Sequence, residues 1–242
     1  MDRALFAAAS GMAAQERNLD TIADNLANAG VVGFKGSVAS FAELVEPGGG
    51  GQGTVALGSH VLFAQGKLAR SAGPFDLAID GPGFFEVVDA RGRHAYTRDG
   101  QFSRAADGTL RNALDYRLAG LRIPGGALSA SVDESGTVRA IFPAGSRTIG
   151  RITLAEFPSP DRLRAIDGAI FAATPAAGRV TAAGAGSPDG PKIRFGMLEE
   201  SNVTIIEAMM QILTAQRAYE ANAKGVQAAD EMLRIANNLQ RG

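Results

Sequence analysis

The residues that could carry acid–base, nucleophilic or metal chemistry are few in this chain of 242 residues. There is no cysteine, which excludes disulfides, thiolate metal sites and a cysteine nucleophile. The two histidines, His60 and His94, lack the spacing of metal ligands or of a catalytic group, so we expect surface or turn histidines. The sequence therefore predicts no catalytic residue, no metal site and no cofactor.

The aspartates stand mainly beside glycines, at positions typical of turns. They include Asp76, Asp80, Asp99, Asp107 and Asp133. Local hydrogen bonding in turns explains this placement without catalysis. Gly81-Pro82-Gly83 lies between two predicted strands and does not open a helix, which is the wrong context for a nucleotide. A secreted β-domain enzyme would need paired carboxylates on facing strands, so it remains a remoter alternative.

The composition argues against several classes of partner. A net charge of −1 does not favour nucleic acid or an anionic membrane. With 31 glycines and 6% aromatic residues, the chain suits turn-rich β structure better than a large pocket for a small-molecule substrate. The sequence contains no run of 18 apolar residues, so it predicts no membrane-spanning helix. The first residues lack a signal-peptide pattern, so any export is expected without a cleaved signal peptide.

Both ends of the chain carry apolar residues seven positions apart, a spacing typical of helices that pack along a narrow seam. In residues 2–28 the seam is Leu5, Met12, Leu19 and Leu26, with Ile22 between them. In residues 203–239 it is Ile205, Ile212, Tyr219, Val226 and Leu233, and Asn202 is the expected N-cap. Such a seam must be covered by the other terminus, by another subunit or by both. We expect an assembly interface there.

Three asparagines belong to the same predicted interface. Asn25 and Asn28 lie on one face near the end of the first helix, and Asn222 lies within the seam of the last. An asparagine amide in a seam fixes which partner and which register are allowed. Two alternatives remain open at this point: a monomeric helical hairpin that covers its own seam, and a cytoplasmic coiled-coil adaptor.

The middle of the chain has the short apolar alternations and turn signals of β-hairpins. We expect a loop at residues 47–53, a short helical or irregular stretch at 158–171 and a loop at 174–191. The predicted fold class is α+β: a discontinuous terminal coiled-coil helical domain (1–30 and 202–242) with an inserted mostly-β domain (75–185). An extended connecting region (31–74 and 186–201) joins them.

Several sequence blocks together resemble the flagellar basal-body rod and hook proteins. Those near the N-terminus are residues 19–28 and Gly33-Phe34-Lys35, and the central blocks are residues 75–85 and 96–102. Those near the C-terminus are residues 196–203 and 216–220. The blocks follow the family order and span almost the whole chain.

The resemblance implies a structural subunit and not an enzyme. It implies that the terminal helices polymerise helically into the axial rod, a drive shaft that also walls the export channel. The partners would be further copies, other axial rod and hook proteins, and the flagellar type III export apparatus, with the rod in the periplasm. The Met-Asp start, the short segment 41–75 and residues 192–196 favour the proximal rod type over the distal rod type.

Overall fold

The computed structural model describes residues 2–45, 51–186 and 190–239, which form two compact units. The helical unit takes residues 1–27, 37–62 and 203–242, and the β unit takes residues 28–36 and 63–202. The expected connecting region at 31–74 is thus divided between the two units. The α+β fold class is confirmed, because the terminal helices pack together and the strands lie between them in sequence. No helix in the described ranges is long and apolar enough to span a membrane.

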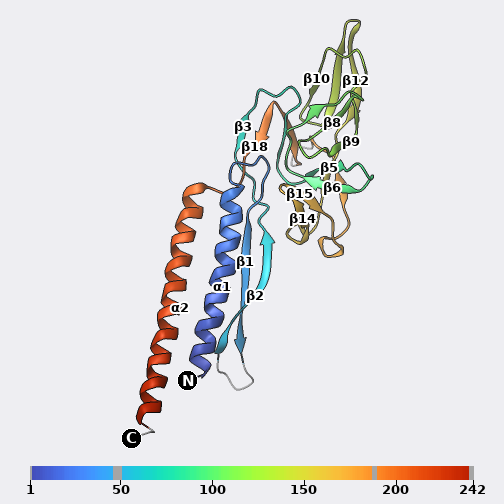
Figure 1. The fold of residues 1–242 in the computed structure, drawn as a ribbon. Coiled ribbons are helices and arrows are strands. Elements are labelled where there is room, and N and C mark those ends of the chain that lie inside the picture. The colour runs from blue at the N-terminus through green and yellow to red at the C-terminus, as the bar shows by residue number, and fades with distance from the viewer. Residues whose placement is uncertain (1, 46–50, 187–189, 240–242) are drawn as a thin grey trace. The chain divides into compact units, whose positions relative to one another are not determined.

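The helical unit is built around α1 (Asp2–Ala27), which lies between α2 (Ile205–Leu239) and a hairpin of two strands (Figure 1). The strands β1 (Ser37–Val45) and β2 (Gly51–Val61) are antiparallel. The expected loop at 47–53 is wrong for residues 51–53, which belong to β2, and residues 47–50 lie outside the described ranges. Glycines made this stretch look irregular, but one of them, Gly53, allows β2 to approach α1.

Gly53 shows why a glycine is needed in β2. Its φ is +114°, and a Cβ there would lie 2.2 Å from the Ser10 Oγ of α1. The neighbouring Thr54 N–H donates to that same Oγ at 3.1 Å. The absence of a side chain therefore lets β2 pack directly on α1.

The N-terminus of α2 differs from the prediction by two residues. Thr204, and not Asn202, caps the helix: its Oγ1 accepts the Glu207 N–H, while the Glu207 carboxylate accepts the Thr204 hydroxyl. Thr204 and Glu207 have the sequence spacing of a capping box, but here the carboxylate accepts the cap hydroxyl rather than the cap backbone N–H. The Asn202 side chain instead accepts the Gly36 N–H at 2.8 Å and donates to the Ala64 carbonyl at 3.2 Å. The Asn202 side chain therefore forms its hydrogen bonds within the β unit and does not cap α2.

In its described residues, the β unit contains sixteen short strands and two 3₁₀ turns. The strands are β3 (Leu68–Arg70), β4 (Leu77–Asp80), β5 (Phe84–Val88), β6 (His94–Thr97), β7 (Ser103–Arg104), β8 (Thr109–Arg111), β9 (Arg117–Arg122), β10 (Ser129–Val132), β11 (Thr137–Phe142), β12 (Gly145–Arg151), β13 (Leu154–Glu156), β14 (Arg164–Asp167), β15 (Ile170–Ala172), β16 (Thr181–Ala183), β17 (Lys192–Phe195) and β18 (Met197–Glu199). The 3₁₀ turns are η1 (Pro160–Arg162) and η2 (Pro175–Ala177). The stretch 158–171, expected to be short helical or irregular, does contain η1, but β14 and the start of β15 also lie in it. The loop expected at 174–191 contains η2 and β16, and its residues 187–189 lie outside the described ranges.

The strands form one large sheet and several smaller ones. The nine-stranded sheet has the order β14-β15-β6-β5-β9-β8-β7, with β13 attached to β5 and β16 to β13. A three-stranded sheet has the order β10-β11-β12, and the pairs β17–β4 and β18–β3 complete the set. The turn at residues 81–83 therefore passes the chain from one sheet to another, because β4 and β5 do not pair with each other.

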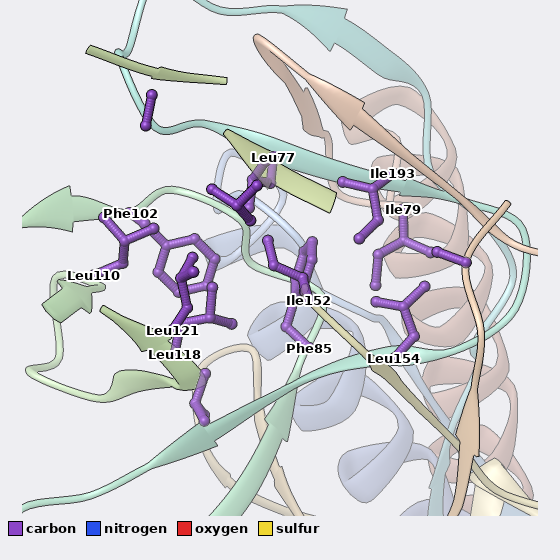
Figure 2. Packing of buried hydrophobic residues seen from close by; sticks show 14 of the residues in the cluster. Leu77, Ile79, Phe85, Phe102, Leu110, Leu118, Leu121, Ile152, Leu154 and Ile193 are labelled. Atoms are coloured by element: carbon purple, nitrogen blue, oxygen red, sulfur yellow. The ribbon is translucent and has the colours of Figure 1, made fainter. Parts of the chain in front are cut away.

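The hydrophobic core of the β unit lies between these sheets (Figure 2). Leu77 and Ile79 of β4 face Phe85 of β5 and Leu154 of β13 across it, and all four are almost fully buried. In the central strands β4 and β5, alternate residues belong to the core, Leu77 and Ile79 in the first and Phe85 and Val87 in the second, as expected for strands of a sheet with one buried face. The apolar alternation that predicted strands here comes from this burial.

Four hairpin loops of the β unit share one geometry. In each, the first N–H donates to the carbonyl four residues on, as Asp89 does to Arg93, and the fourth residue donates back to the first. The loops are residues 89–93, 105–109, 112–116 and 133–137. The fourth residue is left-handed in every loop: Gly92, Gly108, Asp115 and Gly136. This is a three-residue loop with a bulge, and it explains the Asp–Gly spacing in the sequence.

Candidate assembly interface

The two terminal helices bury a small apolar seam. Ile22 of α1 and the alanines Ala208 and Ala215 of α2 are almost fully buried in it. Leu19, Leu26 and Ile212 pack against them and are partly buried. Four of these six side chains, Leu19, Ile22, Leu26 and Ile212, are predicted interface residues that the structure brings together. The alanines let the helix backbones approach closely.

Farther along the helix pair, Asn222 of α2 lies against Gly11 of α1. A Cβ added to Gly11 would lie 2.9 Å from the Asn222 Nδ2 atom. The next small pair, Gly225 and Ala8, would come within 3.9 Å of each other in the same test. The spacing of these pairs means that the helices are antiparallel. That the Asn222 amide fixes the register stays a prediction.

Asn25 forms a two-point contact with the first residue of β1. Its Nδ2 donates to the Ser37 carbonyl at 2.7 Å, and its Oδ1 accepts the Ser37 N–H at 2.8 Å. The side chain is 9% exposed, so both bonds are largely shielded from water. The amide thus pairs with the strand edge as a neighbouring strand would. Its role in contacts between subunits stays a prediction.

The other predicted residues occupy more varied places. Leu5, Met12 and Val226 are half-buried, whereas Ile205 and Tyr219 are exposed. The structure does not bring Ile205 and Tyr219 into the buried seam.

Two further predicted residues lie outside the helical unit or its described side chains. Asn28 follows the end of α1 and belongs to the β unit. Leu233 is in α2, but its side chain lies outside the described part of the chain.

An outer apolar stripe on α2 was missed from the sequence. It consists of Ile206, Met209, Met210 and Leu213, which are each at least half exposed, with Ile206 79% exposed. These positions repeat at three, four and seven residues, so they share one helix face. The stripe ends where Arg217, Glu220 and Lys224 continue that face. A second apolar periodicity beside the seven-residue seam was the signal that could have revealed it.

A groove lies beside the stripe, between α2 and β1 and over α1. Its volume is about 470 Å³, and its walls include Met210 and Ala218 of α2, Asn18 and Ile22 of α1, and Val38 of β1. Apolar atoms dominate the surface of the groove. Among the described residues, no group of three His, Asp or Glu side chains could hold a metal ion. The groove and the stripe offer packing surface rather than chemistry.

Comparison with known proteins places this arrangement in a family. Residues 5–35 match the family described as flagella basal body rod protein, and residues 195–239 match flagellar basal body rod FlgEFG protein C-terminal. Residues 78–140 match the flagellar hook protein FlgE/F/G D1 domain. FlgG of Borreliella burgdorferi is 37% identical over 264 residues, with all of both chains covered. The chain belongs to the flagellar basal-body rod protein family.

Membership of this family makes the chain a structural subunit, not an enzyme, that assembles with other axial proteins of the flagellar basal-body rod. FlgG of Caulobacter vibrioides is 35% identical, with 98% of this chain and 99% of the relative covered. FlgF of Mesorhizobium japonicum is 32% identical, with 92% and 91% covered. The sequence features above favour the proximal rod type, which is FlgF. The relatives favour FlgG, the distal type, and correct that preference.

Proposed function

We propose that this chain is a FlgG-type subunit of the distal rod that polymerises helically through its helical unit. In this proposal, the terminal helices form the wall of the export channel and transmit torque along the rod. The subunit is exported by the flagellar type III apparatus without cleavage of a signal peptide and assembles in the periplasm. Its partners are further copies of itself and the adjacent axial proteins.

The observation that carries the proposal is the outer apolar stripe of α2. In the described part of the chain, Ile206, Met209, Met210 and Leu213 are each left at least half exposed. Full burial of one such side chain contributes about 1.5–3 kcal/mol. A neighbouring subunit that covered all four would therefore gain several kcal/mol from this stripe alone. Both the stripe and the groove lie in the helical unit, which supports contacts between helices of successive subunits.

A pair of double variants tests the stripe. Met209→Ser with Leu213→Ser removes two apolar contacts from the stripe, and Gln216→Ser with Gln227→Ser changes two exposed polar positions on the same helix. Each full-length variant replaces the native gene in the source bacterium. We expect the first to lose rods and swimming and the second to keep both. Normal rods with the stripe variant would overturn the role of the stripe.

The position in the rod needs a separate measurement. A labelled copy of this chain in purified hook–basal bodies is located by immunogold electron microscopy. A FlgG-type subunit places the gold at the end of the rod nearest the hook, as expected here. Gold at the end nearest the cytoplasmic membrane would restore the FlgF reading. The stripe experiment remains valid in either case, because both types use the same terminal helices.

A further inference from the structure

Three of the sequence blocks that carry the family resemblance meet at one buried carboxylate of the β unit. Lys35 comes from the first connecting segment, Arg98 follows β6, and Glu199 ends β18. The side chains of Lys35 and Glu199 are fully buried, and that of Arg98 is 5% exposed. Lys35 and Glu199 are 164 residues apart in sequence. Such a cluster joins parts of the chain that no local interaction could hold together.

The Glu199 carboxylate has a partner for each oxygen. Its Oε1 accepts Lys35 Nζ at 2.6 Å and the Gly66 N–H at 2.8 Å, while its Oε2 accepts Arg98 Nη1 at 3.2 Å. Lys35 Nζ also donates to the Ala64 carbonyl at 2.8 Å. Burial lowers the pKa of Lys35, although the Glu199 carboxylate opposes that shift. Two cations, Lys35 and Arg98, thus share the single carboxylate of Glu199, and both lose their ionic partner if that carboxylate is removed.

The backbone segments around the cluster are also joined to one another by hydrogen bonds. The Gly33 N–H donates to the Glu199 carbonyl at 2.7 Å, and the Asn202 N–H donates to the Phe34 carbonyl at 3.4 Å. Gly33 has a φ of +67°, and a Cβ there would lie 2.4 Å from the Asp99 nitrogen. The two segments, residues 33–36 and 199–202, therefore lie against each other and against the loop after β6.

We propose that Lys35, Arg98 and Glu199 form a latch that fastens both connecting segments to the β unit in the unassembled subunit. The latch fixes the separation of the two chain positions, Asn28 and Asn202, from which the chain leaves the β unit for its terminal helices. The three side chains are positioning residues: they act on assembly by holding these segments. The proposal concerns the free subunit, so it stands or falls separately from the rod function.

The alternative is that the cluster contributes stability alone. Replacing a whole buried ion cluster by apolar side chains is often neutral or stabilising, whereas breaking a buried ion pair leaves one charge without its partner. In this cluster, loss of Glu199 would leave two cations without a carboxylate, whereas loss of Lys35 leaves the Arg98–Glu199 pair. A cluster that only stabilises can therefore be replaced without consequence. A cluster that positions the segments loses that role even when the stability of the unit is restored.

The test is hydrogen exchange with mass spectrometry on the full-length monomer. In Lys35→Met we expect the amides of residues 33–36 and 199–202 to exchange at least about tenfold faster, while strands β5 and β6 remain protected. Lys67→Met is the matched control, because Lys67 is an exposed lysine of the same unit. Unchanged exchange at both segments in Lys35→Met would overturn the latch.

A triple variant separates positioning from stability and covers the case in which Lys35→Met fails to fold. Lys35→Met, Arg98→Met and Glu199→Met together remove every charge of the cluster. We expect the urea midpoint of the β unit to stay near the wild-type value, with fast exchange at residues 33–36 and 199–202. Wild-type exchange at these segments in the triple variant would show that apolar packing suffices and would overturn the proposal.

Discussion

Asp99 is a carboxyl group whose environment opposes its charge. Burial raises its pKa to about 6, and the nearby Asp76 carboxylate adds to the rise, while the Gln101 N–H that Asp99 accepts opposes it. Asp76 itself is only 3% exposed and accepts the Ser71 hydroxyl. Because the folded pKa lies above the unfolded value of 3.8, protonation of Asp99 favours the folded state. This stabilisation is complete below about pH 3.8 and is lost as the pH rises through 6.

Asp99→Asn should therefore stabilise the β unit at neutral pH. The amide oxygen can still accept the Gln101 N–H, but the variant carries no buried charge. We expect a gain of about 1–2 kcal/mol at pH 7.5 and about a third of that gain at pH 4.5, where the unfolded carboxyl is mostly ionised but the folded one is not, as measured by urea unfolding. Asp167→Asn, at an exposed position of β14, is the control and should change neither value. Equal gains at the two pH values would contradict the assignment of the shift to Asp99.

In the hairpin loops, two glycines have nearly the same backbone conformation but different surroundings. Comparing them separates the cost of a left-handed backbone from the cost of a steric clash of the added Cβ. Gly92 has a φ of +80° and open space where a Cβ would stand. Gly136 has a φ of +81°, but a Cβ there would lie 2.4 Å from the Ile152 carbonyl oxygen. The first position needs glycine for conformation alone, and the second needs it also because the chain after β12 passes close by.

The corresponding alanine variants should differ in cost. We expect Gly92→Ala to lower the free energy of unfolding by about 1–2 kcal/mol, the usual cost of a left-handed alanine. Gly136→Ala should cost at least about 1 kcal/mol more, because backbone must move as well. Urea unfolding followed by circular dichroism measures both. Equal losses in the two variants would mean that the loop of residues 133–137 moves away from Ile152 without cost.

The elements also show what the sequence could and could not predict. The seven-residue repeat identified α1 and the buried seam at Ile22, because periodicity reports burial against a parallel or antiparallel partner. The same seven-residue repeat also placed Tyr219 in the seam, but Tyr219 is exposed. The repeat alone does not show along which part of the helix the partner helix lies close. Gly53 was taken for a loop because its reason to be glycine is Ser10, far away in sequence. Lys35 and Glu199 gave no local signal either, for the same physical reason.

Across the whole molecule, the two units differ greatly in buried apolar content. The seam of the helical unit centres on Ile22, Ala208 and Ala215, two of which are alanines. The core of the β unit contains large side chains from many of its strands, including Phe85 of β5, Leu154 of β13 and Ile193 of β17 (Figure 2). Helices depend on tertiary packing for most of their stability. The free subunit should therefore hold its β unit more firmly than its helical unit.

Unfolding of the full-length monomer in urea should consequently occur in two steps. We expect helical circular dichroism to fall at a lower urea concentration than the one that exposes the amides of β5 and β6 to exchange. In assembled rods, the helices should exchange as slowly as the strands, since neighbours then cover the stripe at Ile206 and Leu213. A single coincident transition in the monomer would indicate a self-sufficient helical hairpin. The polymer interpretation would then rest on the family and the exposed stripe.

The spacing of contacts along the chain sets an order of folding. The hairpin bond from Asp89 to Arg93 closes after four residues, whereas the bond from Lys35 to Glu199 spans 164. Short loops close quickly and with little loss of entropy, while distant pairings form late. In a chain that becomes free to fold from its N-terminus onward, the hairpins form before Glu199 is available to pair with Lys35. Lys35 can thus pair with Glu199 only in a chain that is complete through β18. In a subunit truncated before β18, the first connecting segment would lack this ion pair to the rest of the β unit.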